Sequence, residues 1–195
     1  KASVKLRAQY AVSSLANTDY FDQLMTGPEL LQYYRETGLY SDAEINNFKT
    51  KYFKETDFQW YKYVYQPAPL YSADVSVSGG TNSVNYYLSA GALSQDGLRM
   101  GSSYKKTFGR MNLGAKLNPW ARLNLNTSVS YDKTRVSPFG NNNAVGGGLA
   151  AMNAPFASPY DPNTGEELQR VPLLDIVTPT HVITTNPSSN NAFVL

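Results

Sequence analysis

Apolar and polar residues alternate with a period of two along several stretches of the chain, most cleanly in residues 121–132. The odd-numbered positions of that stretch are apolar apart from Thr127, and the even-numbered positions are all polar or charged. A period of two places successive side chains on opposite faces of a β-strand. The pattern therefore predicts a strand with one apolar and one polar face.

The same alternation recurs elsewhere, and turn residues separate most of the stretches. The expected strands are residues 2–13, 70–78, 84–93, 104–117 and 121–132. The segment GGTNS at 79–83 and the dipeptide Asn118-Pro119 each stand between two strands and predict hairpins. The fold class expected from this order is all-β, with the strands in an antiparallel meander.

The connections between the strands differ in length and in pattern. Residues 16–69 form a long connection, in which Pro28 begins one expected helix and the capping-box pair Ser41 and Glu44 begins another at about 42–54. After residue 133 the alternation fades, and repeated Asn, Gly and Pro residues predict a long irregular loop over 133–195.

Strand length and the chemistry of the two faces bear on whether the sheet meets lipid. Transmembrane strands need about 9–11 residues, whereas strands of soluble proteins average about 5–6. The stretches 84–93, 104–117 and 121–132 fit the longer class, and we expect their apolar faces to carry no charge. Short turns also alternate with long loops, as at the two rims of a membrane barrel. We favour a segment of a large transmembrane β-barrel with long extracellular loops carrying short helices over a soluble β-sandwich.

Composition excludes several classes of function. The 195 residues include no Cys and one His, which excludes a disulfide scaffold, a cysteine nucleophile and a thiolate or His-rich metal centre. The net charge of +2 is spread along the chain, so the basic footprint of a nucleic-acid-binding protein is missing. No apolar run approaches the ~18 residues of a spanning helix, and no leader peptide is visible.

Motifs that suggest catalysis or metal binding all fail on spacing. Residues 161–166 resemble a calcium loop, but Gly165 stands where the third oxygen ligand belongs. Glu166 and Glu167 are adjacent instead of facing each other across a cleft, and the glycines at 146–148 lack the Lys-Ser/Thr of a phosphate-binding loop. His181 has no companion ligand. We therefore expect no enzyme activity, no bound metal and no cofactor.

Six residues are candidates for contact with a transported or bound molecule. Trp60, Tyr61 and Tyr63 belong to an aromatic cluster that could stack on sugar rings or peptides, although packing within the loop or an interfacial belt is the favoured explanation. The other candidates, on the polar faces of the expected strands, are Arg110, Asn124 and Asn126.

A series of motifs, in order, resembles the SusC/RagA-like TonB-dependent transporters. They are DFQW (57–60), PAP (67–69), SVSGGT (76–81), YYLSAG (86–91), QDG (95–97), YKK (104–106), GRMNL (109–113), NPWARL (118–123) and NTSVSY (126–131). Weaker likeness at MTGPEL (25–30) and PYDPNTG (159–165) extends the resemblance over about residues 1–170.

The resemblance implies a barrel of about 22 strands in the Gram-negative outer membrane, plugged by an N-terminal domain and driven by TonB. In that family a SusD-like surface lipoprotein covers the barrel mouth, and the pair imports oligosaccharides or peptides. Residues 1–195 would be the first barrel strands after the plug. No plug domain is seen in the sequence, so the TonB complex is expected to act through that missing region. Outer-membrane lipid is a further expected partner, and nucleic acid is not.

Two other functions remain as alternatives. A soluble β-sandwich that binds carbohydrate or peptide should bury Val75, Val77, Leu123 and Leu125 in a closed core. A structural outer-membrane pore or adhesin would be favoured if the parent gene encoded no plug domain upstream.

Overall fold

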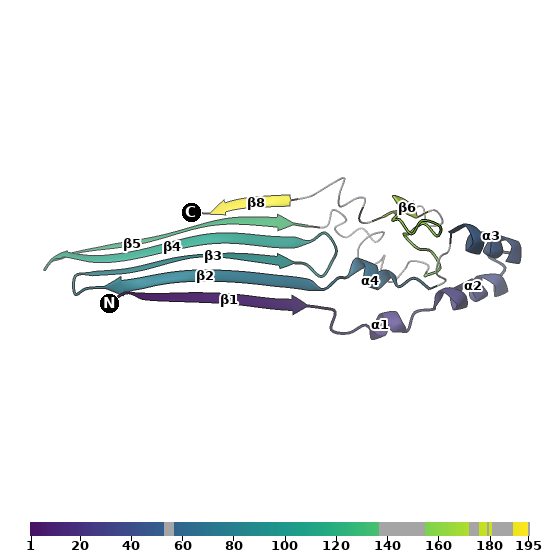
Figure 1. Cartoon of the computed structure of the whole chain (residues 1–195), viewed down its shortest axis with the longest axis horizontal. Helices are drawn as coiled ribbons and strands as arrows, with labels where there is room; N and C mark the ends of the chain where they lie inside the picture. The colour runs from purple at the N-terminus through teal and green to yellow at the C-terminus, as the bar shows by residue number, and fades with distance from the viewer. Residues whose placement is uncertain (53–56, 137–154, 172–175, 179, 181–188, 195) are drawn as a thin grey trace.

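Long strands form a single antiparallel sheet, which occupies one half of the molecule (Figure 1). The structure, a computed structural model, describes residues 1–52, 57–136, 155–171, 176–178, 180 and 189–194. The strands lie in the order β1, β2, β3, β4, β5 and β8. Their bounds are Ser3–Ser13 for β1, Ala68–Gly80 for β2, Val84–Asp96 for β3, Ser103–Asn118 for β4, Ala121–Arg135 for β5 and Ser189–Val194 for β8. The predicted antiparallel meander is confirmed.

The lengths of the strands and of their connections follow the barrel pattern. Strands β2 to β5 contain 13 to 16 residues, more than the about 9–11 that a tilted strand needs to cross a membrane. Tight turns join β2 to β3 and β4 to β5 at the end of the sheet that lies away from the helices (Figure 1). The longer connections emerge at the opposite end. Short turns at one rim and long loops at the other are typical of outer-membrane barrels.

The register of the strands continues both faces across the sheet. One cross-strand row joins Leu6, Val75, Ala90, Gly109 and Val129, from β1 through β5. Cross-strand partners in an antiparallel pair point to the same face, so this row and the alternate rows beside it form one continuous apolar surface. The rows between them form the polar face.

The apolar face is open in the structure. Val75, Leu123 and Leu125 are 41%, 48% and 43% exposed, and Val77 is half-buried. A soluble sandwich would bury these side chains against a second sheet. Their exposure disfavours that alternative and suits a surface that meets lipid.

The expectation that this face carries no charge is wrong at the loop end of the sheet. The row that starts with Tyr10 and Tyr71 continues through Ser94 to Lys105 and Lys133. Lys105 lies near the start of β4, before the stretch that alternates cleanly, and Lys133 lies just beyond the expected end of its strand. The apolar face is therefore charged at one rim and apolar below it.

The long loop expected over 133–195 also contains regular structure. Strand β5 continues to Arg135, and β8 pairs with it from Ser130↔Val194 to Arg135↔Ser189. Two short strands, β6 (Arg170–Val171) and β7 (Ile176–Val177), form a separate pair. The sequence of β8 lacks clear alternation, and its pairing depends on the edge that β5 offers.

Among the described residues, four helices lie beyond the loop end of the sheet (Figure 1). They are α1 (Asp19–Asp22), α2 (Gly27–Glu36), α3 (Asp42–Tyr52) and α4 (Trp60–Val64). The two expected helices correspond to α2 and α3, and each starts with a capping box, at Thr26 with Glu29 and at Ser41 with Glu44. Within the described residues no helix is long and apolar enough to span a membrane, a finding that concerns helices alone.

The buried core lies among these helices, outside the sheet. The described core cluster consists of Leu31, Ile45, Trp60, Tyr63, Val64, Phe156, Ala157 and Val171. Its members come from α2, α3, α4 and the segment 155–171, so this packing fixes the loops to one another. The sheet contributes two exposed faces of different chemistry, as a barrel wall between water and lipid requires.

Candidate functional site

The polar face of β3, β4 and β5 gathers asparagine side chains in two adjacent rows. Asn124 lies opposite Gly114, which lies opposite Asn85. Asn126 lies opposite Asn112, which lies opposite Tyr87. These residues line a hollow of about 340 Å³. The register thus brings Asn124 and Asn126 together with three polar side chains from two neighbouring strands.

Gly114 allows the amides to converge. A Cβ at this position would collide with Oδ1 of Asn85 and would lie 3.4 Å from Oδ1 of Asn124. Because Gly114 has no side chain, the amide groups of Asn85 and Asn124 can both approach the space beside its Cα. Sequence reasoning missed Asn85, Asn112 and Gly114: the NPW turn (118–120) predicts the β4–β5 hairpin, but an irregularity between Lys116 and Asn118 shifts the register.

Arg110 lies on the same polar face, nearer the loop end. Its cross-strand partners are Ser89 on β3 and Ser128 on β5, and it lines a second hollow of about 330 Å³. Arg110 is exposed, and within the described part of the chain it has no carboxylate at ion-pair distance. Lys106, by contrast, lies 3.5 Å from Asp132.

The chemistry of this face favours binding over reaction. Amide groups donate and accept hydrogen bonds, and an arginine guanidinium can donate two parallel hydrogen bonds to one carboxylate. The ring of Tyr87 adds a stacking surface beside the amides. Peptide groups, terminal carboxylates and sugar hydroxyls are all ligands that such a surface recognises.

Two of the three aromatic candidates are buried among the loop helices. Trp60 and Tyr63 are 3% and 8% exposed, and their rings pack edge-on against each other at 5.8 Å between centroids. The Tyr63 hydroxyl donates to Glu167. Burial, and then this hydrogen bond, raise the pKa of Tyr63 well above its usual range. In this position both rings pack within the core of the loop helices.

Tyr61 is the accessible member of the aromatic cluster. It is half-buried and stacks on Phe21, with ring centroids 4.7 Å apart and planes 8° from parallel. It also lines a loop pocket of about 440 Å³, together with Asp22, Asp57 and Gln59. Of the loop candidates, Tyr61 is the residue that a bound molecule could reach.

Residues 161–166, whose sequence resembles a calcium loop, begin with a turn at Asp161–Gly165. Oδ1 of Asp161 accepts hydrogen bonds from the backbone N–H groups of Asn163 (2.7 Å) and Thr164 (2.9 Å), which lower the pKa of its carboxyl. The described residues contain no group of three or more His, Cys, Asp or Glu side chains placed to bind a metal. His181 and the glycines at 146–148 lie outside the described residues.

Comparison with known proteins finds similarity to receptors and transporters. No protein-family profile matches the chain. It is 27% identical over 123 residues to the TonB-dependent receptor P26 of Formosa agariphila (strain DSM 15362), an alignment that covers 63% of this chain and 12% of that protein. The chain thus spans a small part of this relative.

Two solved structures share the fold over nearly the whole chain. The RagAB peptide transporter matches with a TM-score of 0.83 at 21% identity, and the RagAB peptide importer in its open-open state matches with 0.86 at 20%. Each match covers 99% of this chain and 25% of the solved chain. Together with the receptor's sequence similarity, these matches confirm the resemblance carried by the motifs: the chain is similar to a part of the barrel of the SusC/RagA-like TonB-dependent transporters.

Proposed function

We propose that this chain is part of a TonB-dependent transporter in the Gram-negative outer membrane. The observation that carries the proposal is the two-faced sheet, apolar on one side and lined with Asn, Ser and Arg110 on the other, in the fold of the RagAB transporter structures. A barrel wall that separates lipid from a hydrated lumen needs these two surfaces. Residues 1–195 would be the first strands after the plug.

We further propose that the cargo is a peptide, with an oligosaccharide as the second candidate. Two fold neighbours are named as peptide transporters. The exposed guanidinium of Arg110 suits a peptide's terminal carboxylate, and the Asn85, Asn112, Asn124 and Asn126 amides suit its backbone. The same amides also suit sugar hydroxyls, so the favoured cargo depends mainly on Arg110.

No chemical step is part of the proposal. The relative and the fold neighbours are named as receptors and transporters. The polar face offers amides, hydroxyls and basic groups that can bind a cargo molecule, and the carboxylate of Asp132 on this face is already engaged by Tyr104, Ser130 and Lys106. Energy for import would come from TonB acting on the plug.

The loop helices are the natural contact for a SusD-like lipoprotein. They lie together at the rim opposite the short turns, which is the extracellular rim of outer-membrane barrels (Figure 1). Their mutual packing around Trp60 and Tyr63 gives a fixed surface on which a lid protein could sit.

Uptake by cells that carry the full transporter tests the proposal. Deleting the gene should abolish uptake of a fluorescent oligopeptide, and Arg110→Gln should reduce it roughly tenfold, since a hydrogen bond to a charged group contributes about 1.5–3 kcal/mol. Arg122→Gln, on the same face near the short turns, is the matched control. Unchanged peptide uptake after gene deletion overturns the proposed function. A normal Arg110→Gln strain overturns only the role of that residue.

A further inference from the structure

Three basic side chains lie at the loop end of the sheet on the face that is apolar nearer the short turns. Lys105 and Lys133 are direct cross-strand partners, and Arg135 follows Lys133 by two residues on the same face. Direct partners have Cβ atoms about 4.5–5.5 Å apart and diagonal neighbours about 7–8 Å, and like charges so placed repel. The fold therefore holds three cations close together on this face.

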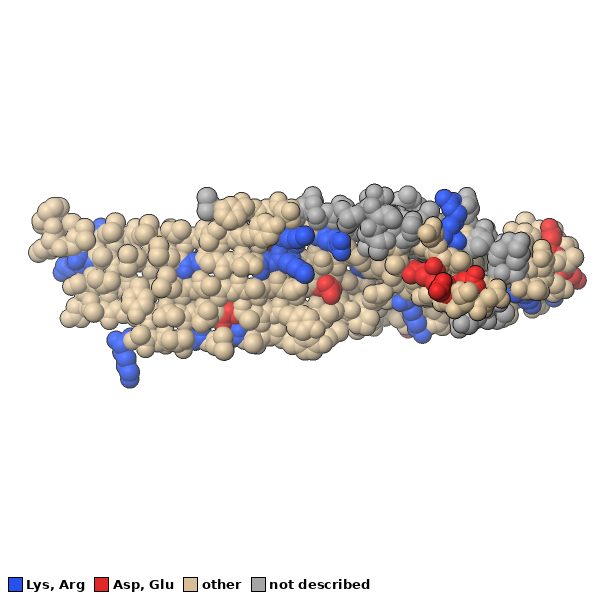
Figure 2. Space-filling model, turned by 45° about the horizontal axis from the view of Figure 1, so that its top comes forward, with Lys and Arg blue, Asp and Glu red and all other residues tan. Residues whose placement is uncertain are grey.

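Neighbouring carboxylates do not neutralise these cations. Lys105, Lys133 and Arg135 are all exposed, and none has an ion pair with any described residue. Asp96 shares their face as the diagonal neighbour of Lys105 on the adjacent strand β3, two strands from Arg135, and it forms no ion pair within 4 Å with any of the three cations. Figure 2 shows basic side chains gathered where the strands meet the loops, with little charge over most of the sheet. An anion placed between the cations would relieve their repulsion.

An aromatic border lies level with the basic cluster and one row below it. The rings of Tyr10 and Tyr71 lie in the same row as Lys105, with centroids 5.1 Å apart. Tyr131 and Phe193 are partners in the next row toward the short turns. Aromatic girdles of outer-membrane barrels lie at the level of the lipid headgroups. The three cations are thus at headgroup height on the lipid side of the wall.

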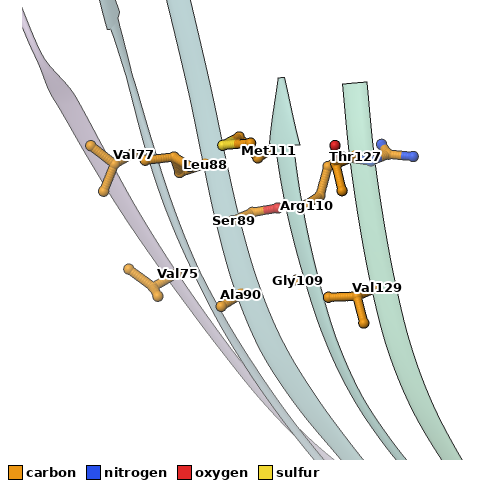
Figure 3. Close-up of a pocket in the computed structure, with 10 residues that line it drawn as sticks. All are labelled: Val75, Val77, Leu88, Ser89, Ala90, Gly109, Arg110, Met111, Thr127 and Val129. Atoms are coloured by element: carbon orange, nitrogen blue, oxygen red, sulfur yellow. The ribbon is translucent and has the colours of Figure 1, made fainter. Parts of the chain in front are cut away.

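A shallow hollow opens on the same face below the border. It measures about 400 Å³ and is lined mainly by Val75, Val77, Leu88, Met111 and Val129. Figure 3 shows these side chains around the small residues Ala90 and Gly109, which leave the space between them open. Gly109 follows Lys105 by four residues on β4, a distance of about 13 Å at ~3.3 Å per residue. The hollow and the basic cluster are therefore aligned along one strand.

We propose that this face binds one phosphorylated membrane lipid, with its phosphates on Lys105, Lys133 and Arg135 and one acyl chain in the hollow. Phosphate oxygens accept short, charge-assisted hydrogen bonds from ammonium and guanidinium groups. The aromatic border and the apolar hollow identify a lipid, and not free phosphate, as the occupant. The inference rests on the membrane location in the proposed function and is independent of the cargo.

Lipid retention by the purified full transporter tests the proposal. The protein in mild detergent is mixed with diphosphorylated lipid A or with its dephosphorylated form, and bound lipid is counted by native mass spectrometry. The wild type should retain the diphosphorylated form selectively. Lys105→Gln/Lys133→Gln should weaken that retention by on the order of tenfold, because each basic residue contributes to binding an anionic surface. Equal retention by the wild type and this variant overturns the proposal.

The matched control is another like-charged cross-strand pair on the opposite face. Lys116 and Arg122 are direct partners on the polar side of the sheet, near the short turns. Lys116→Gln/Arg122→Gln removes the same charge as the test variant and should retain lipid like the wild type. A loss equal to that of Lys105→Gln/Lys133→Gln would show a net-charge effect and overturn the assigned site.

A second variant and a competitor separate the two halves of the site. Gly109→Leu fills the hollow and should weaken retention while leaving the cations in place. Its Cβ would lie 3.6 Å from Cγ1 of Val129, an ordinary contact that the fold accommodates. Displacement of the lipid by millimolar inorganic phosphate would identify a phosphate site and overturn the lipid assignment. Lipid retention without any cargo uptake would count against the transporter and leave this inference standing.

Discussion

Gly91 marks a close approach on the polar face that no larger residue could share. A Cβ there would lie 2.7 Å from Cζ of Phe108 and 2.9 Å from the carbonyl oxygen of Ala73, and a backbone oxygen has little freedom to move. We expect Gly91→Ala to lower the free energy of unfolding by about 1–3 kcal/mol, as overpacking does. Thermal unfolding of the full transporter in detergent measures the change.

The matched control for this prediction is Gly109→Ala. Gly109 has no atom closer than 3.6 Å to its virtual Cβ, so the same added methyl group should cost little. Equal unfolding midpoints for Gly91→Ala and Gly109→Ala would show that the space at Gly91 is less restricted than the structure has it.

The buried Tyr63 makes the stability of the loop core depend on pH. Burial and the hydrogen bond to Glu167 raise its pKa in the folded state, so folding favours the neutral phenol. The stability that this provides is fully present below about pH 10, the ordinary tyrosine pKa, and is lost as the pH rises above it. We expect the unfolding midpoint of the wild type to fall more steeply than that of Tyr63→Phe as the pH rises above about 10.

Tyr20→Phe supplies the comparison, because Tyr20 is 63% exposed. It should leave the alkaline slope of the wild type unchanged. At neutral pH, Tyr63→Phe should cost only about 0.5–1.5 kcal/mol, because it keeps the buried ring and removes one hydrogen bond. An alkaline slope as steep in Tyr63→Phe as in the wild type would assign the effect to other groups.

The candidate residues fall into two groups: those whose position follows from the local sequence pattern, and those whose burial depends on residues far away in the chain. Alternation in 121–132 is local, and the structure places Asn124 and Asn126 on the polar face together with Arg110. Burial of Trp60 and Tyr63 depends on Phe156, about a hundred residues away, and on Glu167. No local pattern reports such partners, so the sequence could not separate these two rings from the accessible Tyr61.

At the level of elements, α2 and α3 begin with capping boxes that titrate. Hydrogen bonds from Thr26 lower the pKa of Glu29, and those from Ser41 lower the pKa of Glu44. Because the folded-state pKa is lowered, the stabilisation is present above the ordinary carboxyl pKa of about 4.3 and is lost as the pH falls through the folded value. We expect the helix starts to loosen in acid.

Amide hydrogen exchange of the peptide that covers α2 tests this in the full transporter. The wild type should be more protected than Glu29→Ala at pH 6, and the difference should shrink toward pH 3. Glu29→Gln retains the capping geometry without a titrating group, so its protection relative to Glu29→Ala should not change with pH. A wild-type advantage that persists at pH 3 would contradict the ionised cap.

The sequence predicts those strands that pair with the next strand along the chain through a short turn. The hairpins around 79–83 and 118–120 join consecutive strands, and the turn residues announced them. Strand β8 pairs with β5 across more than fifty intervening residues, and SNNAFV offers little alternation from which to infer it. The charge on the apolar face was missed because Lys105 precedes the cleanly alternating part of β4 and Lys133 lies beyond the expected end of its strand, and only the register makes the two lysines neighbours.

At the scale of the whole molecule, the sheet has no core of its own. Its polar face suits water and its apolar face suits lipid, and the buried cluster lies among the loop helices. Such a sheet is stable only where each face meets its own solvent and its edges find further strands, since unpaired edges are prone to aggregation. Under the proposed function, the membrane is part of the environment for which this sequence specifies a structure.

Two adjacent residues on β5 test that environment directly. Val129 lies on the apolar face in the middle rows, and Ser128 lies beside it on the polar face. In the full transporter in a bilayer, Val129→Arg should destabilise the fold by about 2–4 kcal/mol, the cost of arginine facing lipid near the midplane. Ser128→Arg should cost far less, because its guanidinium would stand in water, where salt screens its repulsion from Arg110, the cross-strand partner. Denaturant unfolding in lipid vesicles measures both variants. Equal destabilisation would show that the two faces meet the same surroundings, which a barrel wall does not allow.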